Sequence, residues 1–257
     1  MFSKKAKTLM AIAGMLVLGG CGNNAFDSIA DKNSSAANKE AAQMAIDGGN
    51  YQTAVDLLKG ACPSNVCSDV KTSQQLAAAY MGQAGLNMLD LAKFADQNKS
   101  GTTTSFTTIT KSLSYTSGSA TAIGSALSVL TNTSQTGLTA AQKNDLNTQI
   151  GVTAATSAII QIGSVTGGFN TTTGLPTTSA TIPTATATTV ANNLITAANA
   201  LNQITTTGTN TTAQQIYTLN NNIATGGTTC SGTSTSTTAT SAQISAGING
   251  YMTACVK

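Results

Sequence analysis

The side chains that could do chemistry in this chain are of few kinds. Among 257 residues there are 12 lysines, 9 acidic residues with Glu40 as the single glutamate, five cysteines and five tyrosines, but no histidine, arginine or tryptophan. Without histidine, the chain cannot use imidazole acid–base catalysis, a Ser-His-Asp triad or a histidine-containing zinc site. Without arginine, it cannot clamp phosphate or carboxylate groups with a guanidinium fork. We therefore expect a non-catalytic protein with no cofactor and no bound metal.

Cys21 lies at the end of a short segment of the export type. Three lysines, at positions 4, 5 and 7, precede an apolar run from Thr8 to Leu18, which is shorter than the roughly 20 residues that span a bilayer. The run ends in Leu18-Gly19-Gly20-Cys21. This arrangement resembles a bacterial lipoprotein signal with its lipobox, which implies cleavage before Cys21 and acylation of that residue. The alternative is an ordinary secretory signal followed by a coincidental cysteine.

Removal of residues 1–20 would change the charge of the chain. The full chain has a net charge of +3, whereas the cleaved chain has 9 lysines and 9 acidic residues. Beyond Lys111 the charged residues are Lys143, Asp145 and Lys257, so no basic patch is available and we expect no nucleic-acid binding. Gly22, rather than Asp, follows Cys21. By the same resemblance, this implies a lipid anchor in the outer membrane, and we expect the periplasmic face rather than the cell surface.

The remaining cysteines, Cys62, Cys67, Cys230 and Cys255, form an even set in an exported chain. Four cysteines allow three pairings, and we expect the local one, Cys62–Cys67 with Cys230–Cys255. In the chain-entropy description, the shorter loop would stabilise the fold by about 2 kcal/mol and the longer one by about 3.5 kcal/mol. The alternatives are a four-thiolate zinc site or a redox pair, and both are disfavoured because no Cys-x-x-Cys spacing occurs.

Two further motifs have familiar spacing but are incomplete. Ser68 and Lys71 fit the Ser-x-x-Lys pattern of penicillin-recognising enzymes, yet the Ser-Asp-Asn and Lys-Thr-Gly motifs of that family do not occur. Asp96 to Gly101 matches the first half of a calcium loop, but Thr107 occupies the position of the bidentate glutamate. The same segment, and residues 31–35, fit an Asp-x-Asn-x-Ser glycosylation sequon. The alternative for each segment is an ordinary turn.

Aromatic and threonine-rich segments offer weaker candidates for binding. Tyr51, Tyr80 and Phe94 could line a ligand groove, but aromatic residues on one helix stripe are more often core residues. The Thr-x-Thr run at residues 184–188 is similar to the faces of ice-binding proteins, but no fixed repeat period accompanies it. We therefore expect the aromatic residues, together with Leu58, to pack the scaffold.

Hydrophobic spacing places these residues on helices. The chain has 46 Thr, 24 Ser and 21 Asn, together with 39 Ala, which favours closely packed helices. Residues 38–46, the segment that starts at Tyr51, and residues 73–97 have apolar side chains at helical spacing. The Asp47-Gly48-Gly49-Asn50 segment predicts a break between the first two, and Pro63 predicts a turn between the second and third.

The first part of this pattern resembles a tetratricopeptide-type helix pair. Ala42, Gly49-Asn50-Tyr51, Ala54 and Leu58 lie at the offsets of that family's small, aromatic and bulky positions, and Ala77 and Tyr80 repeat the start of the motif 35 residues later. The match then fails, because Leu89 occupies the place of a small residue. The resemblance covers residues 38–95 and implies a right-handed array of antiparallel helical hairpins. A plain helical hairpin is the alternative.

Later helices are predicted over residues 106–115, 120–130, 138–165, 190–204, 213–223 and 242–255. Thr139 and Gln142 have the spacing of a capping box at the start of the third of these. Residues 166–189 and 226–240 are rich in Thr, Ser and Gly and are predicted to be loops. Because threonine favours strands, strand structure is an alternative for some of these segments.

These observations predict an all-α protein with three parts. Residues 1–20 are the lipoprotein signal, 21–37 the lipidated cysteine and a polar tether, and 38–257 a single helical domain, with a tetratricopeptide-like part at 38–98 and a Thr-rich part at 99–257. We expect a lipid-anchored envelope protein that binds a partner protein or peptide, because helical repeats form extended binding surfaces. The alternatives are a surface-exposed structural or adhesive lipoprotein and a solute-binding accessory of a transporter.

Overall fold

The fold is known from a computed structural model, and helices are its regular elements among the described residues. The structure describes residues 34–86, 118–170, 172, 176–178, 181–204, 211–225 and 239–255. Across these residues there is no β-strand, only an isolated bridge between Phe169 and Pro176. The prediction of an all-α protein is confirmed, and the strand alternative is wrong for these segments.

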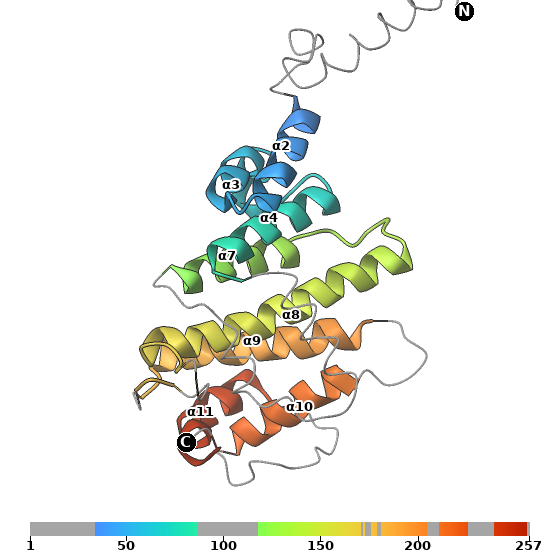
Figure 1. The fold of residues 1–257 in the computed structure, drawn as a ribbon. Helices are drawn as coiled ribbons and strands as arrows, with labels where there is room; N and C mark the ends of the chain where they lie inside the picture. The colour runs from blue at the N-terminus through green and yellow to red at the C-terminus, as the bar shows by residue number, and fades with distance from the viewer. Residues whose placement is uncertain are drawn as a thin grey trace, which may run out of the picture. The chain divides into compact units, whose positions relative to one another are not determined.

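The chain divides into two compact units, residues 1–38 and 39–257, and the packing described below lies within the second. Figure 1 labels the helices along the chain. Their bounds are α2 Ser35–Asp47, α3 Tyr51–Lys59, the 3-10 helix η1 Pro63–Asn65, α4 Val70–Gln83, α7 Ser119–Thr131, α8 Ala140–Val165, α9 Thr184–Asn202, α10 Thr211–Ala224 and α11 Ser241–Cys255.

The helices α2 and α4 are each followed by a glycine in the left-handed backbone conformation. Gly49 has φ +74°, and the Asn50 N–H donates to the carbonyl of Ala45, so α2 ends at the predicted break. Gly85 has φ +81°, and the Leu86 N–H donates to the carbonyl of Met81 at 3.0 Å. The expected helix over residues 73–97 is therefore wrong in extent, because this glycine cap ends α4 at Gln83. Leu89, Phe94 and the helix expected at 106–115 lie outside the described residues.

The capping box predicted at the start of α8 is confirmed. Gln142 N–H donates to Thr139 Oγ1 at 3.2 Å, and the Thr139 N–H donates to Gln142 Oε1 at 2.9 Å. The next helix differs from expectation, because α9 begins at Thr184 instead of Val190. Pro183 has φ −60° and ψ 148°, which is the extended geometry of a residue that precedes a helix. The Thr-x-Thr run at 184–188 thus forms the first turns of a helix and not a loop.

Threonine is accommodated in and next to these helices by bonds to the preceding turn. The hydroxyl of each such threonine donates to the carbonyl four residues earlier, at 2.8–3.0 Å. This local bond satisfies the hydroxyl without a tertiary partner, so a threonine-rich segment can remain helical. The residues concerned are Thr131, Thr133, Thr148, Thr166, Thr188 and Thr189.

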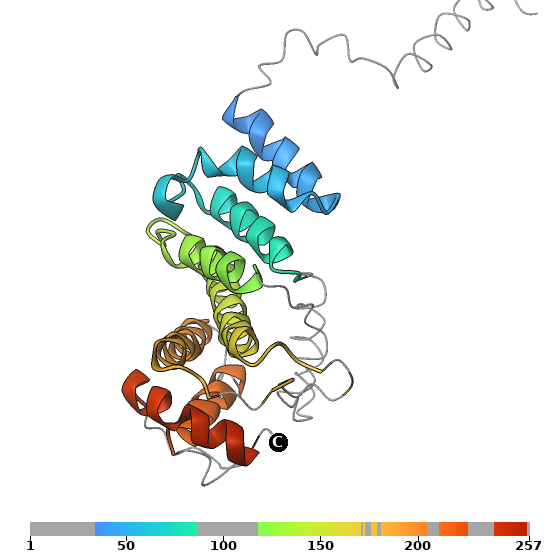
Figure 2. The ribbon, with the colours of Figure 1, turned by 90° about the vertical axis from the view of Figure 1, so that its left-hand side faces the viewer.

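Helices pack mainly on their neighbours in the chain. Contacts join α3 to α4, α4 to α7, α7 to α8 and α8 to α9, while α9, α10 and α11 contact one another. The two longest helices, α8 and α9, make the most extensive contact (Figure 1), and Figure 2 shows the same neighbours from the side. Two clusters of buried apolar residues form the core. One involves α2, α3, α4, α7 and α8, and the other joins α8 to α9, α10 and α11.

Glycines set the distance between helices at several of these contacts. A Cβ at Gly151 of α8 would lie 2.5 Å from the Leu201 side chain of α9, and a Cβ at Gly247 of α11 would overlap the carbonyl oxygen of Ile223 in α10. A side chain at Gly247 would overlap backbone atoms, so the packing of α11 on α10 depends on glycine, whereas a side chain at Gly151 would require Leu201 to shift.

Asparagine side chains supply specific polar contacts in the second cluster. The Oδ1 atom of Asn249, in α11, accepts a hydrogen bond from the Ile182 N–H (2.8 Å), and its Nδ2 atom donates one to the Ile182 carbonyl (3.1 Å). Between α8 and α9, the buried Asn193 donates to the Ser157 hydroxyl at 2.9 Å. Because these partners are far apart in the sequence, the bonds fix which residues face each other.

Within the described residues, no helix is both long enough and apolar enough to span a bilayer.

Candidate functional site

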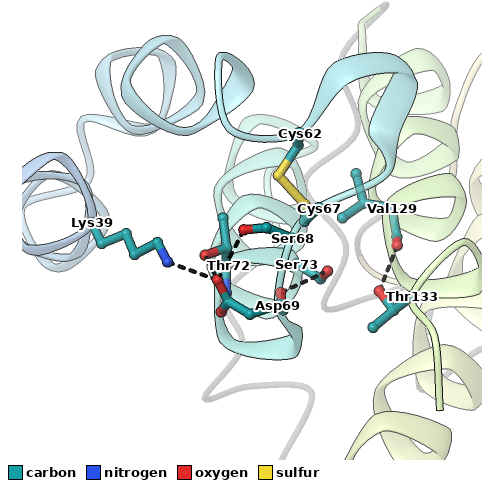
Figure 3. The surroundings of a disulfide bond; sticks show 9 residues. All are labelled: Lys39, Cys62, Cys67, Ser68, Asp69, Thr72, Ser73, Val129 and Thr133. Atoms are coloured by element: carbon teal, nitrogen blue, oxygen red, sulfur yellow. Dashed lines mark hydrogen bonds and ion pairs between the residues drawn. A yellow bond between two sulfur atoms is a disulfide. The ribbon is translucent and has the colours of Figure 1, made fainter. Parts of the chain in front are cut away.

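A disulfide closes the turn between α3 and α4 (Figure 3). It joins Cys62 to Cys67, the first of the two pairs expected from the sequence. Cys62 is 2% exposed and belongs to the core cluster, whereas Cys67 is partly exposed at its edge. Cys21 and Cys230 lie outside the described residues, as does the side chain of Cys255, so the lipidation and the second pair stay predictions.

The turn that the disulfide closes, residues 62–67, has an unusual backbone conformation and is hydrogen-bonded to α7. Ser64 and Asn65 have φ of 53° and 62°, a left-handed conformation that residues other than glycine seldom adopt. Asn65 N–H donates to the Cys62 carbonyl at 3.1 Å, and its side-chain Nδ2 donates to Ser128 Oγ of α7 at 3.3 Å. The turn therefore has one defined conformation and connects α3 and α4 to α7.

Asp69 connects the end of the turn to α2. As the N-cap of α4 it accepts the Thr72 N–H at 2.9 Å, and Lys39 Nζ of α2 lies 2.7 Å from Oδ2 (Figure 3). The Thr72 and Ser68 hydroxyls also donate to this carboxylate. Burial alone would raise the pKa of Asp69, but the hydrogen bonds from Lys39 and Thr72 and the charge of Lys39 outweigh it, so the pKa is well below the usual value.

Glutamines form two hydrogen-bonded rows across α2, α3 and α4. In the first, Gln83 Nε2 donates to Gln52 Oε1 at 2.7 Å, and Gln52 Nε2 donates to Asp56 Oδ1 at 2.9 Å. The second row runs in the same sense, from Gln75 to Gln43 at 3.1 Å and from Gln43 to Asp47 at 2.9 Å. We call these the two glutamine rows.

Both glutamine rows end in an exposed carboxylate that is in no ion pair with the described residues. The residue Gln75 is 8% exposed, and its Oε1 atom accepts no hydrogen bond from the part of the chain that the structure describes. The rows therefore offer amide and carboxylate groups together on the same three helices.

The aromatic residues considered as a groove are packing residues where they are described. The Tyr51 ring covers Gly82 so closely that a Cβ there would overlap it. Tyr80 is 9% exposed, and burial, together with the nearby charge of Asp56, raises its pKa. Leu58 is 1% exposed and packs in the same cluster. Phe94 lies outside the described residues.

The Ser-x-x-Lys pattern does not form a nucleophile site around its serine. Ser68 lies before the N-cap of α4, and its hydroxyl donates to Asp69 Oδ2 at 3.3 Å, while Lys71 is exposed. The calcium-like loop at 96–101 falls outside the described residues. In the part of the chain that the structure describes, no three acidic or cysteine residues are grouped as metal ligands would be.

No protein family, curated protein or solved structure matches this chain.

The glutamine rows and the ion pair of Asp69 were not predicted from the sequence. Each Gln–Asp pair of the rows has a spacing of four residues, which is readable in the sequence as a helix-surface pair. The bonds between helices depend on how α2, α3 and α4 face one another, and no local spacing encodes that.

Amide groups both donate and accept, and carboxylates accept from ammonium and guanidinium groups. The groups of the two rows can therefore form hydrogen bonds and ion pairs with another molecule.

Proposed function

We propose that this protein is a lipid-anchored component of the bacterial cell envelope that acts as a non-catalytic helical scaffold and binds a partner protein or peptide. Packing of the helices mainly on chain neighbours supports the scaffold, since such arrays present long surfaces built from successive helices. The lipobox-like segment ending in Cys21 supports the anchor. Acylation at that residue would hold the chain at the outer membrane, on its periplasmic face.

A tetratricopeptide-like arrangement of antiparallel hairpins for residues 38–98 is part of this proposal. The residues at the motif's small and bulky positions support it, because Ala42, Ala54 and Ala77 are fully buried and Leu58 is 1% exposed. The break between α2 and α3 also falls where the motif requires it. The observation against a longer repeat is the early end of α4 at Gln83.

The observation that carries the binding function is the pair of glutamine rows. An amide side chain can bond an extended backbone at both its N–H and its carbonyl, as Asn249 does with Ile182 in this fold. The exposed Gln52 and the half-buried Gln83 could bond to a partner's backbone in the same way, with the exposed Asp56 available for a basic side chain.

Cross-linking in intact cells, followed by purification of the protein, tests this proposal. We expect a defined partner with the unchanged chain and at least a tenfold smaller yield with the Gln52→Ala/Gln83→Ala variant. Gln203→Ala, an exposed glutamine at the end of α9, is the matched control and should retain the partner. Equal yields from all three proteins would refute binding at the rows.

Anchoring is tested separately by incorporation of labelled palmitate. The unchanged chain should be labelled and should fractionate with membranes, whereas Cys21→Ser should be unlabelled and should remain uncleaved. Labelling of the Cys21→Ser protein would refute acylation at this residue.

A surface-exposed structural or adhesive role is the second candidate. The observation that favours it is the surface of the described residues from 118 to 255, where Lys143 and Asp145 are the charged side chains and exposed Thr, Ser and Asn residues are frequent. Proteinase K treatment of intact cells separates the two roles. Degradation in intact cells favours the adhesive role, and protection until lysis favours the periplasmic scaffold.

A further inference from the structure

The two sulfurs of the Cys62–Cys67 disulfide lie in different environments. Cys62 ends the turn after α3 and is 2% exposed, with its side chain in the core cluster of α2, α3, α4, α7 and α8. Cys67, at the other end of the same turn, packs against the edge of this cluster and is partly exposed. Since thiol–disulfide exchange requires an attacking thiolate to reach one particular sulfur, this difference selects the reactive one.

The residues next to Cys67 in the turn are exposed to solvent. Pro63, Ser64 and Val66 are exposed, with Val66 51% exposed, and Ser68 on the other side of Cys67 is exposed as well. The neighbouring fixed contacts involve other atoms of the turn, namely Asn65 with Ser128 and Asp69 with Lys39. The exposure of the residues on both sides of Cys67 favours the approach of a thiol there over its approach to the buried Cys62.

We propose that Cys67 Sγ is a site of thiol–disulfide exchange for a cysteine-containing reductant, with Cys62 as the leaving group. A thiolate of the reductant attacks Cys67 Sγ, the Cys62–Cys67 bond breaks, and its electron pair goes to Cys62 Sγ, which takes up a proton. A mixed disulfide at Cys67 results. A second thiol of the reductant then attacks the reductant's sulfur in the mixed disulfide and releases Cys67 as a thiolate, which takes up a proton. Both cysteines of the protein are then reduced, and the reductant holds a disulfide.

Reduction should have a local structural effect. The disulfide, together with the bond from Asn65 to Ser128, holds two successive residues in the left-handed region. Once the sulfurs part, Ser64 and Asn65 are free to return to ordinary conformations, and the contact with α7 is lost. The Asp69 cap of α4 lies outside the closed loop and should persist. The exchange site therefore controls the contact between this turn and α7.

Mapping of the mixed disulfide in the full-length, folded protein tests the proposal. The protein is exposed briefly to glutathione, quenched in acid, alkylated and digested with trypsin. Cleavage after Lys59 and Lys71 yields one peptide, residues 60–71, that contains both cysteines. Fragmentation of this peptide in the mass spectrometer then assigns the glutathione. We expect at least ten times more glutathione on Cys67 than on Cys62.

The same reaction in concentrated urea is the control, because unfolding exposes both sulfurs while the sequence around them is unchanged. There we expect the preference for Cys67 to fall to less than threefold. Equal labelling of the two cysteines in the folded protein, labelling mainly on Cys62, or no mixed disulfide at all would overturn the proposal.

Two variants give an independent measurement. Cys62→Ser leaves Cys67 as a free thiol at the surface, and Cys67→Ser leaves Cys62 as a free thiol in the core. With helix content matched by circular dichroism, we expect the first variant to react with an aromatic disulfide reagent at least tenfold faster at residues 60–71. Similar rates would contradict the selection of Cys67 by burial.

Discussion

Replacement of Gly247 by alanine should destabilise the fold, although alanine is the better helix former. A Cβ at this position of α11 would overlap the carbonyl oxygen of Ile223 and lie 2.9 Å from its carbonyl carbon. Both atoms belong to the backbone of α10, so no change of rotamer can relieve the overlap. The two helices would have to move apart, and Ile244 and Ile248, now fully buried, would lose contacts.

The magnitude follows from two opposing effects. Alanine in place of glycine within a helix contributes about 1 kcal/mol of stability through its helix propensity. Overpacking costs about 1–3 kcal/mol, and the upper end applies here because backbone atoms are involved. The net loss in the free energy of unfolding should be about 2 kcal/mol. For a chain of this size, that corresponds to a melting temperature lower by about 4–8 °C.

Urea unfolding of the mature chain, followed by circular dichroism, measures this change. Gly124→Ala is the matched control, because Gly124 lies within α7 and a Cβ there would meet no atom within 4 Å. The control should gain up to about 1 kcal/mol. If Gly247→Ala were as stable as the unchanged protein, or gained as much as the control, the close contact between α10 and α11 would be wrong.

Three further changes test polar contacts of the fold. Asn249→Ala removes both bonds to the Ile182 backbone and should lower the free energy of urea unfolding by about 2 kcal/mol. Ser157→Ala leaves the buried Asn193 amide without its acceptor and should cost about 1–3 kcal/mol in the same assay. Asp69→Asn should remove an acid-sensitive part of the stability. Because folding lowers the pKa of Asp69 from 3.8, its carboxylate contributes fully above that pH and progressively less below it. Unfolding curves recorded across this pH range should therefore show the difference between the two proteins shrinking as the pH falls.

For each of these three predictions, a specific outcome would contradict the reasoning. Full stability of Asn249→Ala would mean that the Ile182 segment does not need the amide contact. A neutral Ser157→Ala would mean that water satisfies Asn193. A constant difference between Asp69→Asn and the unchanged protein down to strongly acidic pH would contradict the lowered pKa of Asp69.

Helix positions were predictable from the sequence where apolar spacing and end signals agreed. The break at residues 47–50 and the capping box at Thr139 are local features, so their outcome depends on few residues. The end of α4 was missed because Leu86 continues the apolar stripe past Gly85, and spacing alone does not reveal that a glycine adopts a positive φ. The start of α9 was missed because residues 166–189, rich in Thr and Gly, were predicted to be one loop, whereas the threonines after Pro183 are helical and their hydroxyls bond to the preceding turn.

Much less of the candidate site could be predicted. The disulfide-closed turn at residues 62–67 was predictable from two nearby cysteines, because a short loop is easily closed. The bonds from Lys39 to Asp69 and from Gln83 to Gln52 join residues about 30 positions apart. Their formation depends on the rotation of each helix about its axis, which the core residues on the opposite faces determine. Polar residues on those faces look interchangeable until the packing is known.

The threonines that bond back to their own helices also determine what this surface offers to its surroundings. The Thr189 hydroxyl donates to the carbonyl of Ala185, so its oxygen lone pairs and its methyl group remain at the exposed surface. The neighbouring Thr188 donates to the carbonyl of Thr184 in the same way, and its oxygen also contacts the Ser245 hydroxyl of α11. A helix surface of this kind accepts hydrogen bonds from water or from a donor-rich molecule, but it has few hydrogens to give and carries almost no charge. Its hydration should therefore change little with pH or salt concentration. Such a surface would therefore keep the same character across a wide range of solution conditions.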